Sequence, residues 1–230
     1  MRHPWATLAL ALAAVALLAG CTPPGPGPAA TPSATPSETS APASPSPSPS
    51  STETDPLALV DELVLRPTLI ELRAAGAIVL EVDFTSDPGD AVAVFTELFG
   101  TPPVSEPYAG TNHAPPGVLH RWDAFVLVER QYSEEYRARH GTFGLQVYFD
   151  GPEAGGIAML TQSGARVGDG WAEASAVAVA SPWECGVTSA EVATYSWPDR
   201  DDRTVIVQMH TEDDARVTWL GAPIDEQVCM

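Results

Sequence analysis

Three observations in the sequence predict an α+β fold for residues 55–230, with an antiparallel sheet and two helices. Runs of β-branched and aromatic residues alternate with turn residues, as in antiparallel strands. Two stretches carry apolar residues at helical spacing and are bounded by capping residues. Residues 1–54 show neither pattern, because an apolar run is followed there by a segment rich in Pro, Ser and Thr.

Residues 1–20 have the pattern of a secretory signal peptide. Arg2 and His3 form a short basic start, and the apolar run from Ala6 to Leu18 follows. This run has about 13 residues, fewer than the roughly 20 that a helix needs to cross the hydrocarbon core. We therefore expect export and cleavage instead of a permanent membrane span.

The tetrapeptide Leu18-Ala19-Gly20-Cys21 closes the apolar run. It resembles the lipobox of bacterial lipoproteins. The resemblance implies that Cys21 receives a thioether-linked diacylglycerol and becomes the new N-terminus. Two acyl chains hold a protein stably where one binds only reversibly, since each buried CH₂ contributes about 0.8 kcal/mol. An ordinary thiol at Cys21, beside a normal cleavage site, is the alternative.

Residues 21–54 are expected to be a lipidated cysteine followed by a disordered tether. Ten of the 23 prolines lie here, and Ser, Thr, Ala and Gly make up nearly all of the rest. Such a composition cannot bury a core. In the polyproline II conformation about 33 residues would reach roughly 100 Å, which sets the domain well away from the membrane. An O-glycosylated stalk is the alternative to a plain spacer.

In the first half of the domain, the sequence predicts four strands and one helix. Asp87 is expected to cap the helix, Pro88 to occupy its first position and Gly100 to end it. Its apolar face comprises Ala91, Val92, Phe95, Leu98 and Phe99. The predicted strands are Leu63–Leu72, Ala77–Phe84 after a turn at Gly76, His120–Glu129 with Trp122, Ala124, Val126 and Val128 on one face, and Thr142–Asp150 with Phe143, Leu145, Val147 and Phe149 on one face.

The second half repeats this order of elements. A helix over Gly170–Ala180, capped by Asp169, follows a strand and a turn at Ser163-Gly164. The predicted strands are Ile157–Thr161, Val192–Trp197, Thr204–His210 and Ala215–Leu220. Two tandem helix-plus-strands repeats, with halves 55–151 and 152–230, are thus an alternative to a single unit.

The order of elements resembles the β-lactamase-inhibitor-protein fold, without a shared motif. The absence of Lys and the use of Ala, Val and Arg are similar to those of surface lipoproteins of high-GC Gram-positive bacteria, the actinobacteria. These resemblances imply an extracytoplasmic, lipid-anchored location and no particular activity.

Cys185 and Cys229 are the cysteines that remain besides Cys21. An even pair in an exported domain predicts a disulfide. Closing a loop of about 44 residues would stabilise the fold by roughly 4 kcal/mol. Free thiols and a redox pair are the alternatives, although Cys-x-x-Cys spacing is absent.

The charge and the missing motifs exclude several classes of protein. The chain has 30 acidic residues, 11 Arg and no Lys, with a net charge of −19, which excludes a nucleic-acid binder that relies on phosphate contacts. Without Lys there is no Schiff-base, P-loop or Ser-x-x-Lys chemistry, and Gly-x-Ser-x-Gly is absent. The His and acidic residues show no metal-binding spacing. We therefore assign no catalytic residue, metal ligand or cofactor.

Five residues are candidates for binding an envelope protein or a glycan. Trp183 and Trp197 stand beside prolines in expected loops, where exposed aromatic rings would recognise a partner. Arg130, Arg137 and Arg139 form the one dense positive segment, in the expected loop 130–141. Tryptophans packed in the core, and arginines in local ion pairs, are the alternatives.

The sequence thus favours a cell-surface lipoprotein that acts by binding through a module on a long tether. The membrane is its expected partner, through the lipid anchor. An envelope hydrolase, with a site built from non-adjacent acidic and His residues, is the alternative.

Overall fold

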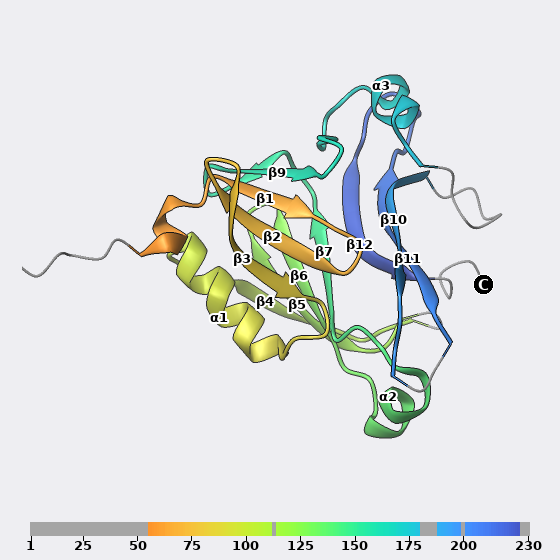
Figure 1. Cartoon of the computed structure of the whole chain (residues 1–230). Coiled ribbons are helices and arrows are strands. Elements are labelled where there is room, and N and C mark those ends of the chain that lie inside the picture. Colours follow the sequence, from red (N-terminus) through yellow and green to blue (C-terminus); the bar gives the residue numbers. More distant parts are fainter. Residues whose placement is uncertain (1–54, 112–113, 180–187, 199–200, 226–230) are drawn as a thin grey trace, which may run out of the picture. The chain divides into compact units, whose positions relative to one another are not determined.

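The computed structural model describes residues 55–111, 114–179, 188–198 and 201–225 (Figure 1). The expected signal peptide, the lipidated cysteine and the tether lie outside these residues. Within the described part of the chain, no helix has the length and apolar character needed to cross a membrane.

The described strands form two sheets, and the fold is α+β with mostly β structure (Figure 1). The five-stranded sheet has the order β3-β2-β1-β9-β8, and the seven-stranded sheet has the order β10-β11-β12-β7-β6-β5-β4. The first comprises β1 (Glu62–Leu65), β2 (Leu69–Ala74), β3 (Ala77–Asp83), β8 (Glu153–Ala154) and β9 (Ile157–Thr161). The second comprises β4 (Val104–Tyr108), β5 (Gly117–Trp122), β6 (Phe125–Arg130), β7 (Leu145–Phe149), β10 (Thr188–Tyr195), β11 (Arg203–His210) and β12 (Trp219–Asp225).

Both sheets draw strands from both halves of the domain. β1 pairs in parallel with β9, and β7 pairs antiparallel with β12. Residues 55–151 and 152–230 therefore share their sheets and do not each form a sheet of their own. The main core likewise combines buried side chains of both sheets, among them Leu63, Leu72, Phe125, Phe149 and Met159.

The predicted helix after Asp87 is confirmed as α1 (Pro88–Phe99). The Asp87 carboxylate accepts hydrogen bonds from the backbone N–H groups of Gly89 and Asp90, and Gly100 ends the helix with a φ of 66°. Phe95 points from α1 into the core, where its ring lies 4.5 Å from that of Phe125 and 6.1 Å from that of Trp122, measured between centroids.

Two runs predicted as single strands are hairpins. Leu63–Leu72 turns at residues 66–68 between β1 and β2, and His120–Glu129 turns at Asp123-Ala124 between β5 and β6. Asp123 has a φ of 55°, which Asp tolerates better than most residues. The turn at Asp123-Ala124 keeps the alternation of apolar and polar residues, so the pattern did not reveal it. Arg66-Pro67-Thr68 does interrupt the apolar run, and Pro67 is a turn signal that the single-strand prediction overlooked. The predicted shared face was also wrong, because Trp122 belongs to the main core whereas Val126 and Val128 do not.

The second predicted helix is shorter than expected. It is α3 (Trp171–Ala176), and its N-cap is Gly170, not Asp169. The Asp169 carboxylate instead accepts a hydrogen bond from the N–H of Arg166 at 2.8 Å. The last helical residue is Ala176 and Val177 is the C-cap, because Val179 forms a bridge with Ser189 in β10 and β-branched residues are weak helix formers.

A third helix, α2 (Glu134–His140), lies in the segment predicted as a loop. Ser133 caps it by accepting a hydrogen bond from the N–H of Tyr136 at 3.1 Å. β4 is a further element that the sequence did not predict, because the side chains from Val104 to Pro107 are exposed and show no alternation.

Candidate functional site

A pocket of about 230 Å³ lies on the seven-stranded sheet, on the side that faces away from the main core. Along β6 and β7, Leu127 and Val147 point into the core, so their neighbours Val128 and Gln146 point to the opposite face. We call this site the Arg130 pocket. The described residues that line it are Tyr108, Ala114, Pro115, Leu119, Val128, Arg130, Gln146 and Tyr148.

Strand register brings these side chains together. Val128 pairs with Leu119 on β5 and with Gln146 on β7, so three strands supply one continuous patch. β5 and β6 approach closely beside it, because a Cβ on Gly117 would lie 2.0 Å from the carbonyl oxygen of Glu129. Tyr108 pairs with Gly117 and so reaches the same face.

Arg130 is held in place by neutral groups. Its guanidinium donates a hydrogen bond to Oε1 of Gln146 and another to the Tyr132 hydroxyl at 3.4 Å. Gln146 in turn donates from Nε2 to the carbonyl oxygen of Pro223 at 3.3 Å. The amide of Gln146 is thus fixed at both ends, and it orients the guanidinium at the pocket.

Arg130 differs from most arginines of the domain in its charge environment. Ion pairs with carboxylates are made by Arg66, Arg73, Arg121, Arg139 and Arg203. No carboxylate of the described residues pairs with Arg130, although its side chain is half-buried. In a chain with a net charge of −19, this leaves a cation in the pocket that a bound anion would neutralise.

An aromatic row continues from the pocket across the sheet. The rings of Tyr148 and Trp219 meet edge to face at 5.6 Å, and Trp219 stacks on His210 at 4.8 Å. Gly221 makes room for the first contact, since a Cβ there would lie 2.8 Å from the Tyr148 ring. Burial raises the pKa of Tyr148 above its usual value, while the nearby Arg130 opposes that rise. The phenol is therefore neutral near pH 7.

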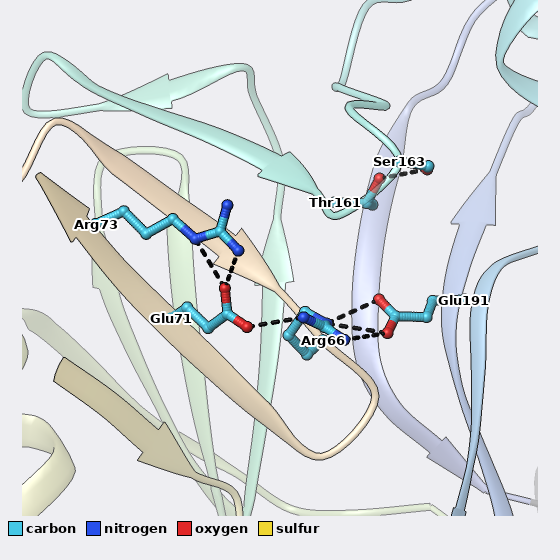
Figure 2. A network of polar contacts seen from close by, with 6 residues as sticks. All are labelled: Arg66, Glu71, Arg73, Thr161, Ser163 and Glu191. Atoms are coloured by element: carbon cyan, nitrogen blue, oxygen red, sulfur yellow. Dashed lines mark hydrogen bonds and ion pairs between the residues drawn. The ribbon is translucent and has the colours of Figure 1, made fainter. Parts of the chain in front are cut away.

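A second pocket has a volume of about 260 Å³. Part of its lining is a network of ion pairs that connects the two sheets (Figure 2). Glu71 of β2 is only 4% exposed and lies between Arg66 and Arg73. Arg66 also pairs with Glu191 of β10, with Nε 2.9 Å from Oε1. Burial lowers the pKa of Arg66, but the hydrogen bonds and charges of both glutamates outweigh it and raise that pKa. The two arginines and the two glutamates compensate one another's charges, so we interpret this network as one that stabilises the fold and not as a ligand site.

Ser105, His120 and Glu129 form a row across β4, β5 and β6. Ser105 Oγ lies 2.9 Å from His120 Nδ1, and His120 Nε2 lies 3.5 Å from a Glu129 carboxylate oxygen. Serine hydrolases use the same residue types, but the Glu129 contact is too long for a good hydrogen bond. None of the three lines either pocket described above. We therefore interpret the row as a contact that joins neighbouring strands.

The three candidate arginines occupy different positions. Arg130 ends β6 and lines the pocket, whereas Arg137 and Arg139 are exposed on α2. Arg139 pairs with Glu135 of the same helix at 2.5 Å, the local ion pair that the sequence left open. The structure thus places only Arg130 at the candidate site.

The candidate tryptophan that the structure describes packs against other rings. Trp197 is half-buried, with its ring centroid 4.7 Å from that of Tyr195 and 5.3 Å from that of Phe143. This packing supports the alternative for Trp197, that its ring is part of the core and does not recognise a partner. Trp183 and the cysteines at 185 and 229 lie outside the described residues, as does Cys21.

Three lining residues were not predicted as site residues: Tyr108, Gln146 and Tyr148. A signal existed for two of them, because Gln146 and Tyr148 alternate with the apolar residues of the predicted strand and must face away from the core. Tyr108 had no such signal, since β4 itself was not predicted.

No group of three His, Cys, Asp or Glu side chains that could hold a metal ion occurs among residues 55–225 where the structure describes them. The chain matches no protein-family model, no curated protein and no solved structure.

Proposed function

We propose that this protein is a lipid-anchored surface protein whose domain binds a small anionic ligand in the Arg130 pocket. One observation carries the binding role: a half-buried arginine without a carboxylate partner among the described residues lies in a pocket walled by apolar and aromatic side chains. Pockets that combine an apolar lining with a few fixed polar groups are typical of ligand sites.

The segment before the domain supports the location. The lipobox-like Leu18-Ala19-Gly20-Cys21 and the Pro-rich stretch after it would hold the domain outside the cell, on a tether of up to roughly 100 Å. A displayed binding module uses such a tether to reach ligands in the surrounding envelope. The membrane is then a partner through the acyl chains alone.

The anchor is tested by Cys21→Ala in cells that produce the full chain. We expect the variant to move from the membrane fraction to the medium or to remain as an unprocessed precursor, because no acyl chains can be attached. Thr22→Ala is the matched control and stays in the membrane fraction. If Cys21→Ala is processed and stays with the membranes, the anchor is of another kind.

The binding role is tested by ligand-observed NMR on the purified full chain. A library of small carboxylates, phosphates and neutral compounds is screened against the wild type, Arg130→Met and the control Arg137→Met. We expect a set of ligands that bind the wild type and the control but not Arg130→Met. Ligands that bind all three proteins alike, or a library with no ligand, would contradict the proposal.

Thermal unfolding of Arg130→Met shows whether the variant folds. If it does not, Arg130→Lys replaces it, because Lys keeps the charge but lacks the planar fork. The proposal then requires weaker binding of the same ligands to Arg130→Lys than to Arg137→Lys.

A further inference from the structure

We infer that the Arg130 pocket takes a small monocarboxylate that carries one apolar ring. This inference rests on the proposed function and narrows its ligand to one chemical class. Three features of the pocket support it: the number of charges, the hydrogen-bond donors that remain, and the size and lining of the space.

A single cation favours a ligand with a single negative charge. Among the described residues that line the pocket, Arg130 is the one that carries a charge. A carboxylate would neutralise it, whereas a phosphate carries close to two negative charges near pH 7 and would leave one uncompensated. The net charge of −19 makes an additional negative charge in a half-buried site more costly still.

Arg130 retains donors that suit a carboxylate. A guanidinium has five N–H donors in a planar fork. Within the described residues Arg130 donates one hydrogen bond to Gln146 and one to Tyr132. The other N–H groups are enough for the two parallel hydrogen bonds that arginine makes to a carboxylate. Because Gln146 is also tied to Pro223, the fork is oriented before a ligand arrives.

The remaining space fits one ring. A volume of about 230 Å³ corresponds to roughly eight water molecules at ~30 Å³ each, or a ligand of about ten non-hydrogen atoms. Leu119 and Val128 supply aliphatic surface, and Tyr108 and Tyr148 supply ring faces or edges. Aromatic side chains prefer offset or edge-to-face contacts with another ring. A compact ring attached to a carboxylate meets each of these conditions.

Three probes of nearly equal shape test the charge and the geometry. Phenylacetate, 2-phenylacetamide and phenyl phosphate share the ring and differ in the group that would meet Arg130. Their dissociation constants for the full chain are measured by isothermal titration calorimetry near pH 7. We expect phenylacetate to bind at least about tenfold more tightly than either other probe.

The variants show whether the preference comes from the pocket. In Arg130→Met we expect the acid and the amide to bind equally weakly, and in Arg137→Met the wild-type order to persist. Arg130→Lys should keep a preference for the acid over the amide but bind it more weakly, because the fork is lost. Thermal unfolding shows whether Arg130→Met is folded. If it is not, the binding of the acid and the amide to Arg130→Lys tests the inference instead.

The outcomes separate this inference from the proposed function. Tighter binding of phenyl phosphate, equal binding of acid and amide, or binding of none of the three overturns the monocarboxylate. The proposed function survives each of these results if the NMR library contains other ligands that depend on Arg130. If no compound of the library depends on Arg130, the binding role fails together with the inference.

Discussion

Phe95→Ala is expected to lower the free energy of unfolding of the domain by about 4 kcal/mol. Phe95 is fully buried, and its ring packs against Phe99, Trp122 and Phe125. Truncation removes the apolar surface of the ring and leaves a cavity that the three neighbouring rings, held by two strands and a helix, can fill only in part. Urea denaturation of the full chain, followed by tryptophan fluorescence, measures the loss.

The control is Glu97→Ala in the same helix. Glu97 is exposed, so its replacement should change the free energy of unfolding by no more than about 0.5 kcal/mol. A loss below about 1 kcal/mol for Phe95→Ala would mean that α1 is not packed on the sheet as described.

Glu71→Ala is expected to lower the free energy of unfolding by about 3 kcal/mol, at the lower end for a broken buried ion pair. The Glu71 side chain is 5% exposed, while those of Arg66 and Arg73 are 28% and 24% exposed. Removing the carboxylate leaves two half-buried guanidinium groups with one partner fewer, and water compensates them only in part. Chemical denaturation measures the change.

Glu81→Ala is the matched control for Glu71. Glu81 lines the same pocket and lies opposite Glu71 in the register of β2 and β3, but it is exposed. We expect a change within about 0.5 kcal/mol. Equal losses in the two variants would show that the network of Figure 2 contributes nothing specific. A double-mutant cycle with Arg73→Ala should give a coupling energy of about 0.5–3 kcal/mol.

Much of the local structure was predictable from short-range signals. The Asp87-Pro88 start and the Gly100 end of α1 are set by the chemistry of helix termini, which depends on a few adjacent residues. The alternation from Phe143 to Phe149 predicted the buried face of β7 correctly. The hairpin at Asp123 and the short α3 were not predicted, because tight turns leave no gap in the apolar pattern and tertiary bridges outweigh helix propensity.

One residue of the candidate site, Arg130, was identified from the sequence, since a cluster of arginines stands out in an acidic chain. The sequence could not separate it from Arg137 and Arg139. That distinction depends on whether a carboxylate lies nearby in space. Arg139 pairs with Glu135 of its own helix, whereas Arg130 donates to the neutral side chain of Gln146 on the neighbouring strand β7.

The amino-acid sequence alone determined the acidic character of the chain and the ends of α1, and it predicted the divisions at residues 20 and 54. Composition and helix capping act over short stretches. Tertiary structure decided which strands adjoin and therefore which side chains line a pocket. β1 reaches β9 across more than ninety positions, and Tyr108, Arg130 and Tyr148 meet through the register of four strands. Register depends on the simultaneous burial of both sheets, a cooperative property that no local pattern contains.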